Sequence, residues 1–274
     1  MTNYICATCG VQFGAGGAPP ETCPICQDER QFVHWEGQRW TTAGELRQQY
    51  ANAVRPEGPG LTGIGTEPAF AIGQRALLLE SPAGNVLWDA ISLIDSATVA
   101  AVRERGGLAA IAVSHPHFYG AMVEWSHALG DVPVYLHADD RRWVMQEDPV
   151  LVFWSGASHT IGPGLTLVRC GGHFAGSSVL HWAGGAGGRG ALLTGDTLQV
   201  TLDRRWVSFM YSYPNYIPLP AETVRRIAAA VEPCAFEQIY GGWFGRNVAA
   251  NGKQVVELSV DRYLRAIGAA ASGA

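Results

Sequence analysis

Short apolar runs bounded by turn residues recur along most of the chain, and amphipathic stretches lie between them. The runs predict buried strands, and they lie at 76–79, 86–88, 109–113, 132–136, 165–170, 178–182 and 191–193. Cap residues and helical spacing predict helices at 95–105, 119–129, 220–233 and 251–270. Strands that alternate with helices indicate sheets covered by helices, an α/β (α+β) class.

One further helix is predicted nearer the N-terminus. Thr42 and Glu45 have the spacing of a capping box, and Leu46 and Tyr50 lie four residues apart on one helical face. The proline- and glycine-rich stretch 55–60 should end this helix, and residues up to about Pro68 are expected to form a linker or the entry to a larger domain.

Composition limits the class of protein. Hydrophobic residues make up 47% of the 274 positions and charged residues 16%, which favours a globular chain with a large core. The net charge of −5 argues against a nucleic-acid surface. The sequence has no apolar run long enough to cross a membrane and no secretory signal at its start, so we expect a cytoplasmic protein.

The first 40 residues carry four of the six cysteines. Cys6 and Cys9 form one Cys-x-x-Cys pair and Cys23 and Cys26 a second, with 13 residues between the pairs. Four thiolates brought together in this way suit tetrahedral zinc, so the segment resembles a zinc ribbon or a shortened rubredoxin. Iron in a redox centre is the rival metal, and redox-active or disulfide-forming pairs are the alternative without metal. A structural zinc is our interpretation, because so short a segment needs a metal to fold.

Polar residues that could bind a second metal follow the predicted strands. His115 and His117 come directly after the strand at 109–113 with Pro116 between them, His173 follows two glycines, and Asp196 ends the strand that begins at Ala191. Three imidazoles and one carboxylate suit zinc, iron or manganese. Asp89 also ends a strand, and we interpret it as a structural hydrogen-bonding residue.

This ordered set resembles the metallo-β-lactamase superfamily over about residues 61–250. The resemblance rests on Asp89, the His115-Pro116-His117 motif, His173, the Thr194-Gly195-Asp196 motif and Tyr240-Gly241-Gly242, with 58 and 23 residues separating His115, His173 and Asp196. It implies an αββα sandwich with metal at the rim between two sheets. The chain is then expected to contain a four-cysteine, zinc-ribbon-like module (1–40), a helix and linker (41–60) and a metallo-β-lactamase-like domain (61–274).

Three positions depart from the family's pattern. Tyr119 stands where the family motif has an Asp, Gly120 where it has a second-site His, and Trp243 or a neighbour where the last His would be. In the family these positions serve the second metal, so the resemblance implies a mononuclear site of His115, His117, His173 and Asp196. Tyr119 could be a fifth ligand, a donor to a developing oxyanion, or a plug that fills the space of the lost metal, and we favour the plug.

The leading functional hypothesis is a metal-dependent hydrolase in which one Zn²⁺ activates water for a small-molecule substrate. Asp196 and Tyr119 are the candidate catalytic residues, and Trp243 and Tyr211 are candidate pocket residues. The first alternative is a mononuclear Fe²⁺ oxygenase similar to persulfide dioxygenases, with His115, His173 and Asp196 as ligands. The second is a non-catalytic, metal-stabilised binding protein whose ribbon docks a partner. A homodimer is also compatible with the sequence.

Overall fold

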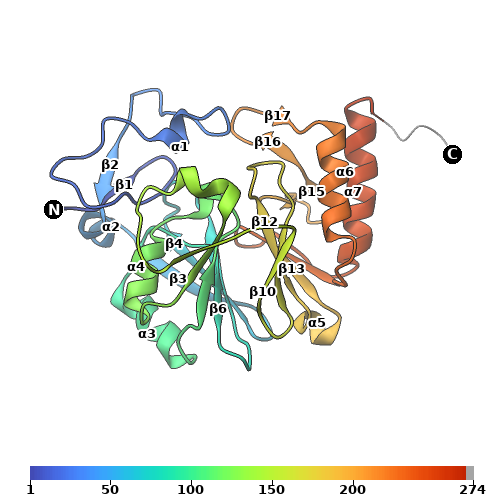
Figure 1. Ribbon diagram of the computed structural model, residues 1–274, viewed down its shortest axis with the longest axis horizontal. Coiled ribbons are helices and arrows are strands. Elements are labelled where there is room, and N and C mark those ends of the chain that lie inside the picture. Colours follow the sequence, from blue (N-terminus) through green and yellow to red (C-terminus); the bar gives the residue numbers. More distant parts are fainter. Residues whose placement is uncertain (270–274) are drawn as a thin grey trace. The chain divides into compact units, whose positions relative to one another are not determined.

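A computed structural model describes residues 1–269 of the protein, and these residues divide into two compact units. The first unit is Met1–Trp154 and the second begins at Ser155. Figure 1 labels elements of both units in chain order. The predicted end of the last helix, at residue 270, lies outside the described residues.

The N-terminal segment of the first unit has few regular elements. Two short strands, β1 (Tyr4–Cys6) and β2 (Trp40–Thr42), pair in antiparallel fashion, and α1 (Pro24–Gln27) lies between them in sequence. Helix α2 (Ala43–Gln49) follows directly. Its capping box is present as predicted, since Thr42 Oγ1 accepts from the Glu45 amide at 3.2 Å and Glu45 Oε2 accepts from the Thr42 amide at 2.9 Å.

The large sheet of the first unit has seven strands. They are hydrogen-bonded in chain order, and they are β3 (Ala51–Gly58), β4 (Leu61–Glu67), β5 (Arg75–Leu79), β6 (Val86–Trp88), β7 (Ala110–Ala112), β8 (Val134–His137) and β9 (Leu151–Trp154). Strands β3 to β6 pair in antiparallel fashion and β6 to β9 in parallel. The parallel part carries the first helices of the αβ pattern, α3 (Ser96–Glu104) and α4 (Met122–Ala128), and the 3₁₀ turns η1 (Pro116–Phe118) and η2 (Ala138–Trp143).

The stretch after α2 was expected to be a linker or the entry to a larger domain, and the structure has the second of these. Residues 51–67 form the paired strands β3 and β4. Pro56 and the glycines of this stretch suggested a break in structure. However, β3 is the first strand of the sheet and has a neighbour on one side only, and an edge strand tolerates a proline because one side of it needs no ladder hydrogen bonds.

The second unit contains a six-stranded sheet in the order β10-β11-β12-β13-β18-β19. Its strands are β10 (Ser158–Gly162), β11 (Leu165–Arg169), β12 (Ser178–Trp182), β13 (Ala191–Gly195), β18 (Gln238–Gly241) and β19 (Asn247–Val248). Strands β13 and β18 pair in parallel, and the other neighbours in this sheet pair in antiparallel fashion. Two small hairpins follow β13, formed by β14 (Gln199–Val200) with β15 (Val207–Ser208) and by β16 (Met210–Ser212) with β17 (Ile217–Pro218).

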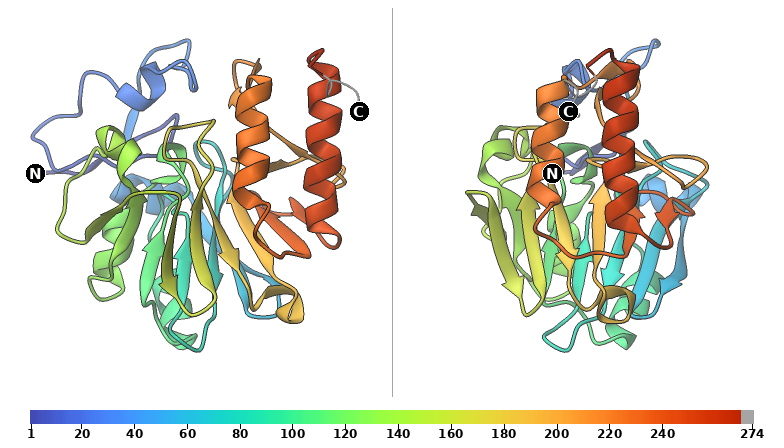
Figure 2. Two further views of the ribbon diagram at one scale, coloured as in Figure 1. Left: turned by 45° about the vertical axis from the view of Figure 1, so that its right-hand side comes forward. Right: turned by 90° about the vertical axis from the view of Figure 1, so that its right-hand side faces the viewer.

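Two helices complete the second unit, besides the short α5 (Gly185–Gly188). Figure 2 shows α6 (Ala221–Val231) and α7 (Gly252–Ala266) side by side. Each buries one apolar stripe, with Val224, Ile227 and Val231 on α6 and Val256, Val260 and Leu264 on α7. These stripes join sheet residues such as Leu192 and Ile239 in one hydrophobic core. The proline and asparagine signals in the sequence therefore predicted the two helices that cover this core.

None of the helices in residues 1–269 is long and apolar enough to span a membrane.

Candidate functional site

The four cysteines of the N-terminal segment converge in the first unit. Their sulfur atoms lie within 4.8 Å of one another, at 3.5 Å between Cys6 and Cys26 and 3.7 Å between Cys9 and Cys23. A disulfide needs about 2.05 Å, whereas the edge of a tetrahedron with bonds of about 2.3 Å is about 3.8 Å. All four side chains are buried. The donor set therefore fits one tetrahedral metal ion, as the sequence predicted.

Local backbone geometry aims these sulfurs at one point. Gly10, directly after Cys9, has a φ of +81° and closes the first turn with a hydrogen bond from its amide to the carbonyl of Cys6. The amide of Gln27 bonds to the carbonyl of Cys23 and closes the second turn. The side-chain amide of Gln38 donates to the sulfur of Cys6 at 3.2 Å, which favours the thiolate form of that cysteine.

In the first unit, His115 and His117 lie in the turn after β7. Oγ of Ser114 and Nδ1 of His115 share a hydrogen bond of 2.9 Å, so Nε2 is the nitrogen of this ring that could bind a metal. The rings of the two histidines lie 5.4 Å apart, centroid to centroid, and both side chains are buried. Both nitrogen-bearing side chains thus belong to one rigid turn.

Asp89 supports this turn from the end of β6. It is buried, has a φ of +64°, and its Oδ1 accepts a hydrogen bond of 2.8 Å from the amide of Ser114. Burial raises the pKa of its carboxyl to about 7, partly offset by the hydrogen bonds from Ser114. The structure thus gives Asp89 the hydrogen-bonding role expected from the sequence.

In the second unit, His173 and Asp196 come together from the loops after β11 and β13. Nε2 of His173 lies 3.9 Å from Oδ2 of Asp196, within the reach of one ion bonded to each at about 2.1 Å. Nδ1 of His173 faces the carbonyl oxygens of Tyr211 at 2.8 Å and Met210 at 3.2 Å. Because carbonyls only accept, Nδ1 carries the proton and Nε2 presents its lone pair toward Asp196.

Tyr119 and Gly120 are buried in the first unit. Burial raises the pKa of Tyr119 well above its ordinary value, and the carboxyl of Asp140 raises it further, so the phenol stays neutral. Gly120 has a φ of +48°, and a Cβ there would lie 2.8 Å from the carbonyl carbon of Ile91 and 2.9 Å from the carbonyl oxygen of Ala90. The backbone therefore leaves no room for a side chain at position 120, where the sequence resemblance implied a lost histidine.

The remaining candidates, Tyr211 and Trp243, lie in the second unit and are partly buried. The carbonyl of Tyr211 accepts from His173, and the amide of Gly242 donates to the carbonyl of Gly195 at 3.1 Å. The segment before Trp243 therefore runs beside the residue that precedes Asp196. The role of Tyr211 and Trp243 as pocket residues stays a prediction.

Two residues have supporting hydrogen-bonding roles that the sequence did not predict, although it offered Tyr213 as one of several aromatic residues that could border a pocket. Ser114 engages His115, and the hydroxyl of Tyr213 donates to the carbonyl of Asp196 at 2.8 Å and of Ser208 at 3.2 Å. The aromatic run that follows Asp196 was the only signal for Tyr213. A hydroxyl adjacent to a candidate ligand was the only signal for Ser114.

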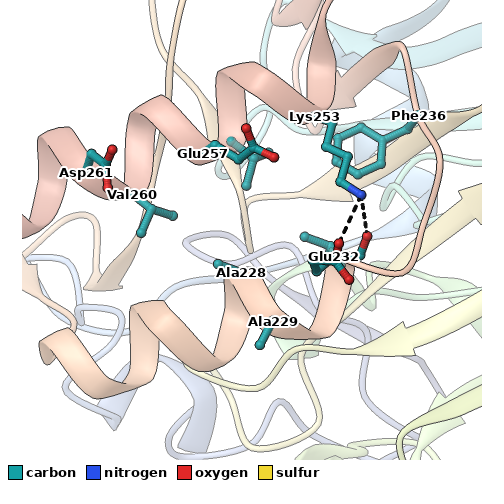
Figure 3. A pocket seen from close by; sticks show the side chains of 10 residues that line it. Ala228, Ala229, Glu232, Phe236, Lys253, Glu257, Val260 and Asp261 are labelled. Carbon is teal, nitrogen blue, oxygen red and sulfur yellow. Dashed lines mark hydrogen bonds and ion pairs between the residues drawn. The ribbon is translucent and has the colours of Figure 1, made fainter. Parts of the chain in front are cut away.

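A separate groove of about 300 Å³ lies between α6 and α7 (Figure 3). Its floor is apolar, with Val231, Phe236 and Val256, and Lys253 on its rim donates to the carbonyl of Glu232 at 2.6 Å. None of the predicted site residues lines it.

Comparison with known proteins connects these features to one fold. No family model matches the sequence. The uncharacterized protein YmaE of Bacillus subtilis (strain 168) is 48% identical over 269 residues, which cover 97% of each chain. Among solved structures, TMB-1 superposes with a TM-score of 0.60 at 13% identity, over 79% of this chain and 99% of that one. The metallo-β-lactamase FIM-1 from Pseudomonas aeruginosa, in its mono-zinc form, gives 0.55 at 15% identity over 78% and 96%.

The coverage of both units by structures of this kind confirms the mixed α/β fold predicted from the sequence motifs. The chain belongs to the same protein family as YmaE of Bacillus subtilis, and its fold is that of the metallo-β-lactamases.

Proposed function

We propose that the protein is a metal-dependent hydrolase with one catalytic metal ion, held by His115, His117, His173 and Asp196. The observation that carries the proposal is the fixed orientation of His173 toward Asp196 in the second unit. Nδ1 of His173 is committed to backbone carbonyls and its Nε2 faces Asp196 at 3.9 Å. Donors fixed in this way before a metal arrives are typical of a binding site.

The first unit supplies the other half of the proposed ligand set. Ser114 engages Nδ1 of His115, and Asp89 holds the amide of Ser114, so the turn that bears both histidines is anchored to β6. Imidazole nitrogens with one carboxylate oxygen are the donors that zinc takes in catalytic sites. We therefore propose Zn²⁺ at this site, and a structural Zn²⁺ at the four cysteines.

The close backbone contacts around Gly120 favour a site for one metal ion and not two. A second ion in the family's arrangement would need ligands at positions 119, 120 and 243, which hold Tyr119, Gly120 and Trp243. No imidazole fits at position 120 without moving the backbone at Ala90 and Ile91. We propose that Tyr119 fills space as a neutral phenol, because its raised pKa prevents it from acting as a base.

The bound metal would lower the pKa of a water molecule to about 7 and polarise a carbonyl or phosphoryl oxygen of the substrate. The residues of the chain would fix the ligands around it. The hydroxyl of Tyr213 donates to the carbonyl of Asp196, and the carbonyl of Tyr211 accepts from Nδ1 of His173 and so keeps the proton on that nitrogen. We propose that Tyr211 and Trp243 also border the space for a small-molecule substrate.

Metal content and turnover of Asp196→Asn test this proposal. The matched control is Asp203→Asn, because Asp203 is an acid of the same unit that lies at the surface. We expect wild type and the control to hold two zinc ions per chain, and Asp196→Asn to lose the central ion and any hydrolysis of chromogenic ester, thioester or phosphoester substrates. Unchanged zinc content and turnover in Asp196→Asn would contradict the proposal.

Two other outcomes would replace the proposal by one of its rivals. Bound iron together with thiol-dependent oxygen uptake would identify an oxygenase. A single metal held by the cysteines alone, with no loss on substitution of Asp196, would identify a non-catalytic binding protein.

A further inference from the structure

The four-cysteine segment makes hydrogen bonds to the turn that bears His115 and His117. The amide of Gln12 donates to the carbonyl of Gly120 at 2.9 Å. Gly120 lies three residues after His117 in the same buried turn. A backbone bond between these two segments links the position of the histidine turn to the conformation of the cysteine segment.

A second bond ties Gly10, which follows the first cysteine pair, to the loop after β6. The carbonyl of Gly10 accepts from Oγ of Ser92 at 2.6 Å, and both residues are buried. The neighbouring carbonyl of Ile91 accepts from the amide of Ala121 at 3.2 Å and from Nε1 of Trp125 at 2.9 Å. Residues 91–92 thus contact the cysteine segment on one side and the continuation of the histidine turn on the other.

The two segments are also closely packed. Val11 and Gln12 are 2% and 5% exposed, and with Tyr119 and Gly120 they line a void of only about 10 Å³, which is too little for more than one water. Further bonds run from the side chain of Asn3 to Glu124 at 2.6 Å and from the amide of Gly14 to the carbonyl of Met145 at 3.0 Å. The cysteine segment therefore packs directly against the turn that bears the two histidines.

The conformation of the cysteine segment depends on the four cysteines. Residues 6–13 contain the first cysteine pair and the four residues after it. The segment before β2 contains only two regular elements, β1 and α1. So small a module with buried thiols derives much of its folding free energy from its metal. Loss of that metal would release the residues that hold Gly10 and Gln12 in place.

We propose that the four-cysteine module is a positioning element for the catalytic metal site. Metal bound by the cysteines fixes Gln12 and Gly10, which hold the turn of His115 and His117 in its metal-binding conformation. Occupancy of the cysteines is therefore a condition for full affinity at the histidines. This inference rests on the proposed function, which makes the two histidines ligands.

A proline at position 12 separates this role from general structural support. Gln12→Pro removes the amide that bonds Gly120, and Gln12→Ala is the matched control because it shortens the side chain and keeps the amide. The measurement is a Co²⁺ titration of the full chain. Thiolate-to-cobalt charge-transfer absorption reports the cysteines, and the weaker ligand-field bands of a nitrogen and oxygen site report the histidines.

We expect Gln12→Pro to keep the thiolate–cobalt absorption and to bind cobalt at the histidine site about tenfold more weakly than wild type. Gln12→Ala should match wild type at both sites. Equal cobalt affinity of the histidine site in Gln12→Pro and Gln12→Ala, with the cysteines occupied, would overturn the proposal. Ser92→Ala, which removes the bond to Gly10, provides a second variant if Gln12→Pro does not fold, and the same tenfold loss is expected.

Failure of the proposed function gives a different result. If wild type binds no cobalt outside the cysteines, the metal role of the histidines is wrong, and coupling is then measured by hydrogen exchange of the amides at 117–122. We expect these amides to exchange at least tenfold faster when the cysteines are stripped of metal. Unchanged protection would overturn the coupling itself.

Discussion

The two groups of candidate metal ligands differ in how they are assembled. The four cysteines lie within residues 6–26 of one unit, and their sulfurs contact one another directly. The histidines and Asp196 come from both units, and in each unit the protein itself holds the ligands, through Ser114 for His115 and through Tyr211 for His173. Under the proposed metal assignments, a metal folds the first group, whereas the fold prepares the second.

The largest expected effect is the loss of metal from the cysteines. Cys9→Ser combined with Cys23→Ser should lower the free energy of unfolding by about 4 kcal/mol or more, because structural metal sites supply folding free energy directly. The measurement is urea denaturation followed by fluorescence and circular dichroism. Cys170→Ser, at a buried cysteine of the second unit, is the control for the loss of a thiol.

A double variant as stable as wild type would contradict the claim that a metal folds the cysteine segment. An equal loss of unfolding free energy on substitution of the histidine-site ligands would contradict the claimed difference between the two groups.

An intermediate effect is expected for Gly120→Ala. The added Cβ would lie 2.8–2.9 Å from backbone atoms of Ala90 and Ile91, at a φ of +48°. Left-handed strain and overpacking together should cost about 2–5 kcal/mol. Gly17→Ala is the matched control, since a Cβ at Gly17 meets nothing within 4 Å, and its expected effect is within about 0.5 kcal/mol.

Gly120→His tests the same point, because it introduces the histidine that the sequence resemblance implies for a second metal site. We expect an unstable protein that gains no third metal ion per chain. A stable variant that binds one more zinc than wild type would contradict the single-ion account.

The smallest effect concerns pH and Asp89. Its pKa is raised to about 7 by burial, so the folded protein keeps this proton between about pH 4 and 7 while the unfolded chain releases it. The contribution of Asp89 to stability is therefore full below about pH 4 and is lost as the pH rises through about 7. Asp89→Asn keeps an acceptor for the amide of Ser114 and cannot ionise.

We expect Asp89→Asn to be more stable than wild type by about 1–3 kcal/mol at pH 8 and to lose this advantage near pH 4. Urea denaturation of both proteins at pH 4.5, 6 and 8 measures this difference. Parallel stability curves for the two proteins would show that the carboxyl is ionised in the folded state throughout.

Much of the fold and site followed from local sequence signals. The capping box at Thr42, the proline and asparagine signals that bound α6 and α7 and the spacing of the cysteines all depend on residues that are near one another in sequence. Strand β3 was missed because a proline at a sheet edge resembles a loop. The predicted helix at 119–129 begins only at Met122, since a 3₁₀ turn and the left-handed Gly120 precede it.

The contacts that the sequence could not predict join distant segments. The bond from Gln12 to Gly120 spans more than 100 residues and uses backbone atoms, which carry no sequence signal. The bond from the hydroxyl of Tyr213 to the carbonyl of Asp196 spans only 17 residues, but its acceptor is again a backbone atom. The His-x-His pattern and the later His and Asp were identified as candidate ligands from their places after predicted strands, but their assignment to one site depended on a family resemblance, because spacing alone does not show that residues 58 and 23 positions apart share a site.

Zinc stoichiometry of wild type and His117→Ala, measured on the full chain by plasma mass spectrometry, tests the central claim most directly. The account predicts two zinc ions per wild-type chain, one at the cysteines and one at the histidines, and one per chain of His117→Ala. A wild-type protein with a single ion that survives the substitution would contradict it, and so would a protein with three.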